Sequence, residues 1–196
     1  MVLPFAEKAS RERIDLLNSL SIYSKKLAKD EQALYYLKES LKEAETAKDS
    51  VWIGIIYGNL SEYSWQEGKV AETFDYLNKN IELSLRYNEL LDAMRANLKL
   101  AQYNLALADW KSASKYVIEA LALMEDKPYF LTYKVDALKC LADIAYLKGD
   151  LKEELKNLKE YLQLKAQLDE QVNNEEIRKI SWKFEVEKYE QALKSN

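Results

Sequence analysis

The sequence contains no histidine, and it has few residues of the kinds that form loops and reactive sites. Among its 196 residues there are four glycines, two prolines and one cysteine. Without histidine the chain cannot build a Ser-His-Asp or Cys-His catalytic site, a histidine-ligated metal site or a phosphorylated histidine. The glycines (Gly54, Gly58, Gly68 and Gly149) do not form a phosphate-binding loop. We therefore expect no enzymatic activity, no cofactor and no metal.

The sequence also lacks a basic block and a long apolar run. Its 29 basic and 33 acidic residues are well mixed and give a net charge of −4. Proteins that bind nucleic acid through phosphates show a basic face or stripe, so we expect no nucleic-acid binding by this segment. No apolar run could span a bilayer, and residues 1–5 do not resemble a signal peptide. The lone Cys140 lies among apolar residues and is predicted to be a buried core residue.

What the chain does contain is typical of helices. Hydrophobic residues make up 48% of the sequence and charged residues 32%, and helix-forming Leu, Ala, Glu and Lys dominate. The predicted fold class is all-α. Ser10 is predicted to be the N-cap of the first helix, and Asp49-Ser50 is predicted to start the third.

A sequence pattern recurs with a period of about 40 residues. Each copy has an apolar segment, a short polar corner and a second segment with small residues. Equivalent positions are Leu20, Leu60, Leu100 and Leu141, and thirteen residues further on Ala33, Thr73, Ala113 and Glu154. Small residues let two antiparallel helices approach closely. The approximate repeats are 10–48, 49–88, 89–127 and 128–169, within a predicted repeat array over 1–169.

These copies resemble the tetratricopeptide repeat, a helix–turn–helix unit of about 34 residues. The Leu-Gly/Ala pair of that family is echoed by Leu20-Ser21, Leu60-Ser61, Leu100-Ala101 and Leu141-Ala142. Its Gly-Asp-aromatic corner is echoed by Gly68-Lys69-Val70, Ala108-Asp109-Trp110 and Gly149-Asp150-Leu151. The closing proline is missing at most junctions, and the period is longer. The resemblance implies a right-handed superhelix of about four helix pairs, followed by a C-terminal helix.

The same resemblance implies a groove lined by the first helix of each pair. The implied groove residues are Asn18, Ile22, Lys25, Glu62, Trp65, Gln66, Arg95, Gln102, Leu105, Lys139, Asp143 and Tyr146. Trp65, Leu105 and Tyr146 are equivalent and would form an apolar row suited to a peptide or helix. The alternative is that neighbouring helices or the C-terminal helix cover these side chains. The Lys and Asn of chaperone-binding members are not reproduced, which argues against a chaperone C-terminus as the ligand.

Two glycines are predicted to lie inside a helix. Gly54 and Gly58 each cost about 1 kcal/mol there relative to alanine. Close approach by the neighbouring repeat would offset that cost, and the alternative is a local weak point in the helix.

Residues 170–196 do not follow the repeat. Asn173-Asn174-Glu175-Glu176 is predicted to start a new helix with two apolar stripes. The stripe of Ile177, Ile180 and Phe184 is predicted to cap the last repeat. The other stripe is predicted to pair with a second copy in a parallel coiled coil, and it consists of Trp182, Val186, Tyr189 and Leu193.

A second resemblance covers about thirty residues at this junction. Tyr161-Leu162-Gln163-Leu164-Lys165-Ala166-Gln167-Leu168, with Glu175-Glu176, Ile180 and the segment 183–188, resembles the junction of Bacteroidetes-type repeat sensors. In those proteins the repeats precede a histidine kinase or a DNA-binding output. This implies a non-catalytic sensor that binds a protein or peptide and is periplasmic if membrane-anchored, otherwise cytoplasmic. The alternatives are a stand-alone scaffold or adaptor and, more weakly, a peptide-pheromone regulator.

Overall fold

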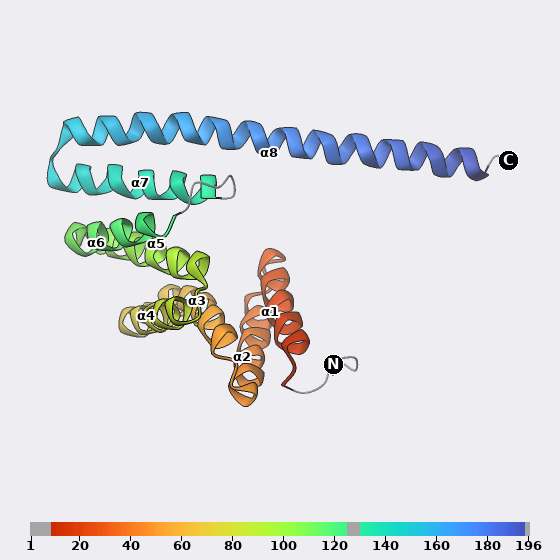
Figure 1. The fold of residues 1–196 in the computed structure, drawn as a ribbon, viewed down its shortest axis with the longest axis horizontal. Coiled ribbons are helices and arrows are strands. Elements are labelled where there is room, and N and C mark those ends of the chain that lie inside the picture. Colours follow the sequence, from red (N-terminus) through yellow and green to blue (C-terminus); the bar gives the residue numbers. More distant parts are fainter. Residues whose placement is uncertain (1–8, 125–129, 195–196) are drawn as a thin grey trace. The chain divides into compact units, whose positions relative to one another are not determined.

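The computed structural model describes residues 9–124 and 130–194, with side chains described up to Glu176. Within these residues the chain forms eight α-helices and no β-strand (Figure 1). They are α1 (Arg11–Lys26), α2 (Asp30–Ala47), α3 (Ser50–Gln66), α4 (Val70–Arg86), α5 (Leu90–Ala106), α6 (Trp110–Ala122), α7 (Leu131–Lys148) and α8 (Leu151–Lys194). The predicted all-α class and the predicted four helix pairs are confirmed.

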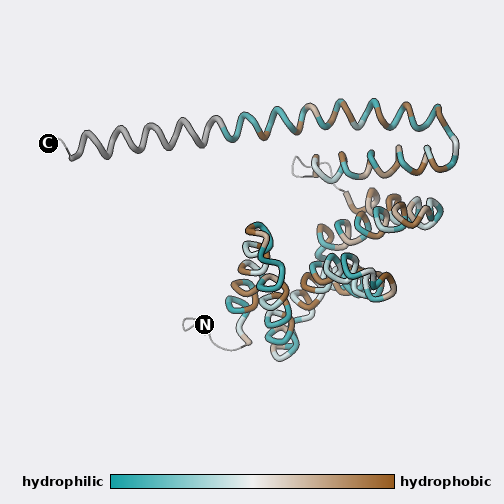
Figure 2. Tube along the Cα trace, turned by 180° about the vertical axis from the view of Figure 1, so that it is seen from behind, coloured by the Kyte–Doolittle hydropathy of each residue, from teal (hydrophilic) through white to brown (hydrophobic). Residues whose placement is uncertain are grey.

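The chain divides into two compact units, residues 1–124 and residues 125–196. The first unit holds three helix pairs, α1–α2, α3–α4 and α5–α6, and the second holds the pair α7–α8. In the first unit α2 also packs on α3, and α4 packs on α5. Within the first unit each pair therefore covers an apolar face of the next, as in other helical repeat proteins. Along every helix whose side chains are described, apolar and hydrophilic residues are interspersed (Figure 2).

Polar side chains begin several of these helices. Ser10 Oγ accepts a hydrogen bond from the Arg13 amide at 3.2 Å, and Asp49 Oδ1 accepts one from the Trp52 amide at 3.3 Å. These contacts satisfy amide groups that a helix N-terminus otherwise leaves without a partner. Both predicted helix starts are confirmed.

Six helices, α1 to α5 and α7, end in the same way. A residue with positive φ follows each helix, and the amide of the next residue donates to a carbonyl five residues earlier at 2.8–3.0 Å. This is the Schellman C-cap, for which glycine is the favoured residue. The positive-φ residues are Ala28, Lys48, Gly68, Asn88, Ala108 and Gly149. Only two of the six are glycine, so a chain with little glycine still turns at each corner.

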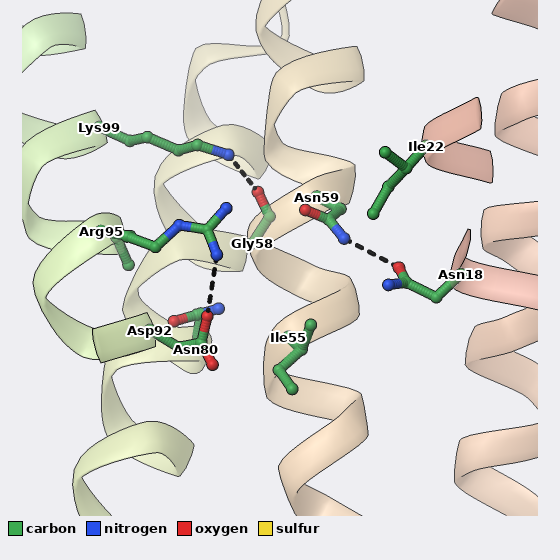
Figure 3. Close-up of a pocket in the computed structure, with 10 residues that line it drawn as sticks. Asn18, Ile22, Ile55, Gly58, Asn59, Asn80, Asp92, Arg95 and Lys99 are labelled. Atoms are coloured by element: carbon green, nitrogen blue, oxygen red, sulfur yellow. Dashed lines mark hydrogen bonds and ion pairs between the residues drawn. The ribbon is translucent and has the colours of Figure 1, made fainter. Parts of the chain in front are cut away.

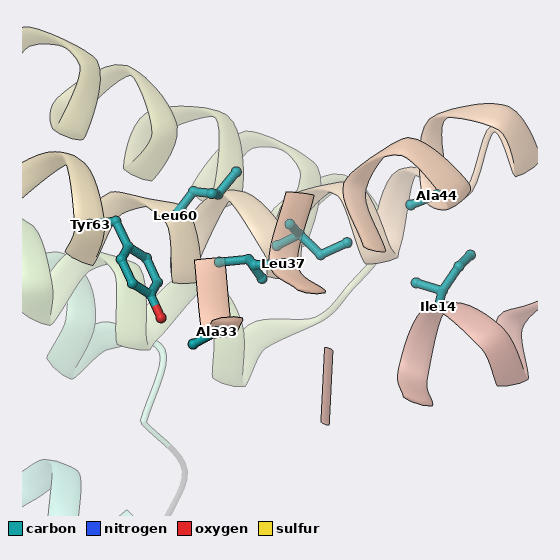
Figure 4. Packing of buried hydrophobic residues seen from close by; sticks show 7 residues of the cluster. Ile14, Ala33, Leu37, Ala44, Leu60 and Tyr63 are labelled. Atoms are coloured by element: carbon teal, nitrogen blue, oxygen red, sulfur yellow. The ribbon is translucent and has the colours of Figure 1, made fainter. Parts of the chain in front are cut away.

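The core of the first unit runs from one pair to the next. One cluster joins α1, α2 and α3 and contains Ile14, Ala33, Leu37, Ala44, Ile56, Leu60 and Tyr63 (Figure 4). A second joins α4 and α5 through Leu77, Ala96 and Leu100. The small residues predicted to let the helices approach, Ala33, Thr73 and Ala113, are completely buried.

The close approach at Gly54 and Gly58 comes from within the same pair. A Cβ on Gly54 would lie 3.1 Å from Leu83 Cβ, and a Cβ on Gly58 would lie 2.5 Å from Asn80 Nδ2. Asn80 and Leu83 belong to α4, the partner of α3. The expectation of close approach is confirmed, but its assignment to the backbone of a neighbouring repeat is wrong. The amide of Asn80 needs this space because it donates to the Gly54 carbonyl at 2.6 Å.

In the second unit α8 is one continuous helix. The predicted start of a new helix at Asn173 is wrong, because α8 runs from Leu151 to Lys194 without a break. No glycine or proline follows Gly149, so the residues that most strongly end a helix are absent from this segment. The side chains of both predicted C-terminal stripes, Trp182, Val186, Tyr189 and Leu193 included, lie outside the described residues. The division at residue 169 stays a prediction.

Helix α8 buries only one side against α7. Asn157 is buried and Leu158, Leu164 and Leu168 are half-buried, whereas residues 169–176 are all exposed. Cys140 on α7 is buried, as predicted, and burial raises the pKa of its thiol to about 12. A thiol in this environment is a packing residue rather than a nucleophile.

Candidate partner-binding groove

Two adjoining cavities lie across the first helices of the three pairs in the first unit. The larger has a volume of about 360 Å³ and the smaller about 90 Å³. Both are lined by Ile22 from α1, Asn59 from α3 and Arg95 from α5. Because three side chains belong to both cavities, we treat the two as one site and call it the groove.

The smaller cavity is lined by both polar and apolar residues (Figure 3). Asn59 Nδ2 donates to Asn18 Oδ1 at 2.9 Å, which links α3 to α1. On the other side Lys99 Nζ donates to the carbonyl of Gly58 at 2.9 Å, which links α5 to α3. These contacts position the floor of the groove by tying three consecutive pairs together.

The larger cavity has an apolar floor and a charged rim. Leu37 from α2 and the ring of Tyr63 from α3 are both buried and line it together with the exposed Ile22. The rim includes Lys25, whose ammonium group lies 5.4 Å from the centre of the Tyr63 ring. A cation over an aromatic face is attracted by the negative π surface, so Lys25 is held at the edge of the cavity.

Glu62 connects both edges of the groove. Its carboxylate forms ion pairs with Lys25 from α1 and with Lys99 from α5, the latter at 2.6 Å. The Lys99 side chain is only 20% exposed, so its charge depends on this partner. Arg95 forms the other ion pair, with Asp92 one turn earlier, at a longer distance of 3.4 Å.

The pKa shifts follow from this arrangement. Burial acts to raise the pKa of Glu62, but Lys99 and Lys25 outweigh it and hold that pKa below its ordinary value. Burial lowers the pKa of Lys99, against the attraction of Glu62. Burial raises the pKa of Asp92, although Arg95 opposes the change. The central carboxylate is thus stabilised as an anion by two cations, one on each side.

Five of the twelve predicted groove residues line the groove, and these are Asn18, Ile22, Lys25, Glu62 and Arg95. Four others, Trp65, Gln66, Gln102 and Leu105, lie on α3 and α5 but do not line either cavity. Trp65 is half-buried because its ring stacks on Tyr103 at 4.2 Å between centroids. Burial, together with the charge of Glu62, raises the pKa of Tyr103 to about 12.

The remaining three predicted residues belong to the second unit. Lys139 and Asp143 on α7 form an ion pair at 2.6 Å, and Tyr146 is exposed. The predicted row of Trp65, Leu105 and Tyr146 spans both units, and it stays a prediction.

Sequence reasoning missed Asn59, Asp92 and Lys99, although a signal for them was present. Asn59 precedes Glu62 by three residues, and Asp92 and Lys99 stand three before and four after Arg95. Residues at these spacings share one face of a helix. The predicted residues Glu62 and Arg95 therefore indicated the helix faces that also carry the three overlooked residues.

The fold of this chain has a counterpart among solved structures. The solved structure "Crystal structure of BtubC (BKLC) from P. vanneervenii" is similar to this chain, with a TM-score of 0.70 and 13% sequence identity. The match covers 80% of this chain and 64% of that chain, so this chain corresponds to less than two thirds of its length. At such low identity the likeness shows the fold alone. No family model matches the sequence, and no curated protein matches it.

The part of the chain that the structure describes holds neither a candidate membrane span nor a candidate metal site. None of its helices is long and apolar enough to cross a membrane. Its cysteine and acidic side chains form no group of three or more that could hold a metal ion.

Proposed function

We propose that this chain is a tetratricopeptide-like interaction array and that a segment of a partner protein binds in the groove. The observation that carries the proposal is the groove itself. It is built by consecutive repeats, it opens to solvent, and it combines an apolar cavity with charged and amide groups at its rim. Ligand sites typically combine apolar walls with a few polar groups that set orientation.

The proposal is tested by selecting peptides and then blocking the groove. Peptides selected from a random 12-residue display library on the full chain are measured by calorimetry against wild type and Ile22→Lys. We expect the charge placed at the edge of the larger cavity to weaken binding at least tenfold. Ile118→Lys is the matched control, because Ile118 on α6 is also an exposed helical isoleucine and does not line the groove. Equal binding by wild type and Ile22→Lys would show that the groove is not the binding site.

We further propose that the array is the sensor part of a signalling protein, with α8 as its output. The support is that α8 continues well past the residues that pack on α7, as a single helix of 44 residues. A continuous helix transmits a rotation or shift at one end to its far end. The finer assignment to Bacteroidetes-type sensors rests on the sequence resemblance.

Solution mass tests this second proposal. Sedimentation of the full chain and of a chain ending at residue 169 should give a dimer and a monomer respectively, because the coiled-coil stripe is removed. A monomer in both cases would exclude dimerisation through α8 and favour the stand-alone adaptor.

A further inference from the structure

The larger cavity is suited to a bulky apolar side chain. Its floor is formed by Leu37 and the ring of Tyr63, and Ile22 stands at its edge. An apolar cavity of about 150 Å³ can hold a benzene molecule, whereas this one measures about 360 Å³. It can therefore take a leucine or phenylalanine side chain together with part of the backbone that carries it.

The charged side chains around the groove are mostly positive. Four cations (Lys25, Lys26, Arg95 and Lys99) and two anions (Glu62 and Asp92) line its two cavities, an excess of positive charge in a chain whose net charge is −4. Such an excess favours an acidic partner.

The two anions restrict which of these cations a ligand can use. Glu62 pairs with both Lys25 and Lys99, so each of these two ammonium groups already has an anionic partner. Arg95 is different, because its only partner among the groove anions is Asp92 at 3.4 Å, and its side chain is 45% exposed. A guanidinium with a long contact and unused N–H groups can donate hydrogen bonds to a second carboxylate. Arg95 also lines both cavities, so it stands next to the position of the apolar anchor.

On the basis of the proposed function, we infer that the groove recognises an internal peptide segment with one bulky apolar residue next to one acidic residue. The apolar side chain enters the larger cavity and the acidic side chain pairs with Arg95. Glu62 is the specificity-determining residue, because it keeps Lys25 and Lys99 from pairing with a second ligand carboxylate.

Capped peptides that differ only at two central positions test this inference. The probes are acetylated and amidated octapeptides of Gly and Ser that carry Phe-Asp, Phe-Asn, Phe-Lys or Ala-Asp at the centre. They are titrated to millimolar concentration into the isotope-labelled full chain, and NMR shifts are followed at the Ile22 methyl groups and the Arg95 side chain. We expect Phe-Asp to bind best, with Phe-Asn about threefold and Phe-Lys about tenfold weaker. We expect Ala-Asp to lose measurable binding.

Two variants connect the preference to named residues. Arg95→Gln should abolish the difference between the Phe-Asp and Phe-Asn peptides. Arg86→Gln is the matched control and should leave the difference intact, because Arg86 is an exposed arginine on α4 paired with Glu82 one turn away. Glu62→Gln should improve binding of a Phe-Asp-Asp peptide severalfold, after circular dichroism has shown that the variant is folded. If Glu62→Gln does not fold, the Arg95 comparison decides alone.

The outcomes separate this inference from the proposed function. If peptides shift the groove signals equally whatever their charge or apolar residue, the inference is wrong and the proposed function stands. If no octapeptide shifts these signals and the display-selected peptides bind outside the groove, both the inference and the proposed function are wrong. An unchanged Asp preference in Arg95→Gln overturns the role given to Arg95.

Discussion

Replacing Gly58 with alanine perturbs a helix interior where alanine is normally the better residue. Because Gly58 lies inside α3, helix propensity alone predicts a gain of about 1 kcal/mol. The new Cβ, however, would lie 2.5 Å from Asn80 Nδ2, which is closer than two such atoms can approach. The Asn80 side chain is almost completely buried and hydrogen-bonded, so moving it away from the new Cβ disturbs buried contacts.

The expected loss follows from the contacts of Asn80. Displacing its amide breaks the 2.6 Å hydrogen bond to the Gly54 carbonyl and the 3.3 Å hydrogen bond that Asn80 Oδ1 accepts from Ser84. A buried polar group left without a partner costs about 1–3 kcal/mol. Subtracting the propensity gain, we expect Gly58→Ala to lower the free energy of unfolding by about 1 kcal/mol.

A double-mutant cycle measures the coupling directly. Urea unfolding is compared for wild type, Gly58→Ala, Asn80→Ala and the double variant. With Asn80 truncated the clash is gone, so Gly58→Ala should then stabilise the protein by about 1 kcal/mol. The coupling energy is then about 2 kcal/mol. If Gly58→Ala stabilises the wild type as much as it stabilises Asn80→Ala, the packing argument for Gly58 is wrong.

Two further predictions concern stability. Glu62→Gln should destabilise the protein by about 1 kcal/mol at pH 7, because Lys25 and Lys99 lose their anion. The folded-state pKa of Glu62 lies below its ordinary value of 4.5, so its contribution is present above that pH and lost as the pH falls through the folded pKa. Wild type and variant should thus converge in urea unfolding as the pH is lowered through the folded-state pKa of Glu62, and a difference that persists in the most acidic buffer would contradict the ion-pair account. Ala28→Gly and Ala108→Gly should each raise the melting temperature by stabilising the fold by about 0.5–1 kcal/mol, because both residues have positive φ. Lower melting temperatures would show that these corners are not left-handed.

The helices and their repetition could be predicted from the sequence because both follow from regular spacings of residues along the chain. Apolar residues recur at helical intervals, and equivalents such as Leu60 and Leu100 stand one period apart. Helix starts at Ser10 and Asp49 depend on hydrogen bonds within one turn, so a few neighbouring residues decide them. The same reasoning failed at Asn173, where a pattern typical of a helix start lies inside the continuous helix α8.

The groove depends on contacts between residues that are far apart in the sequence, and the spacing of neighbouring residues does not reveal these contacts. Sequence reasoning could place Glu62 and Arg95 on the inner face of their helices, but the partners of Glu62 are 37 residues away in each direction. Which lysines reach it depends on the rotation of each helix and on the offset between consecutive pairs. Both are set by how buried side chains such as Ile56 and Leu100 pack. The sequence by itself determined that helices form and repeat, and only tertiary packing decided which side chains meet between them.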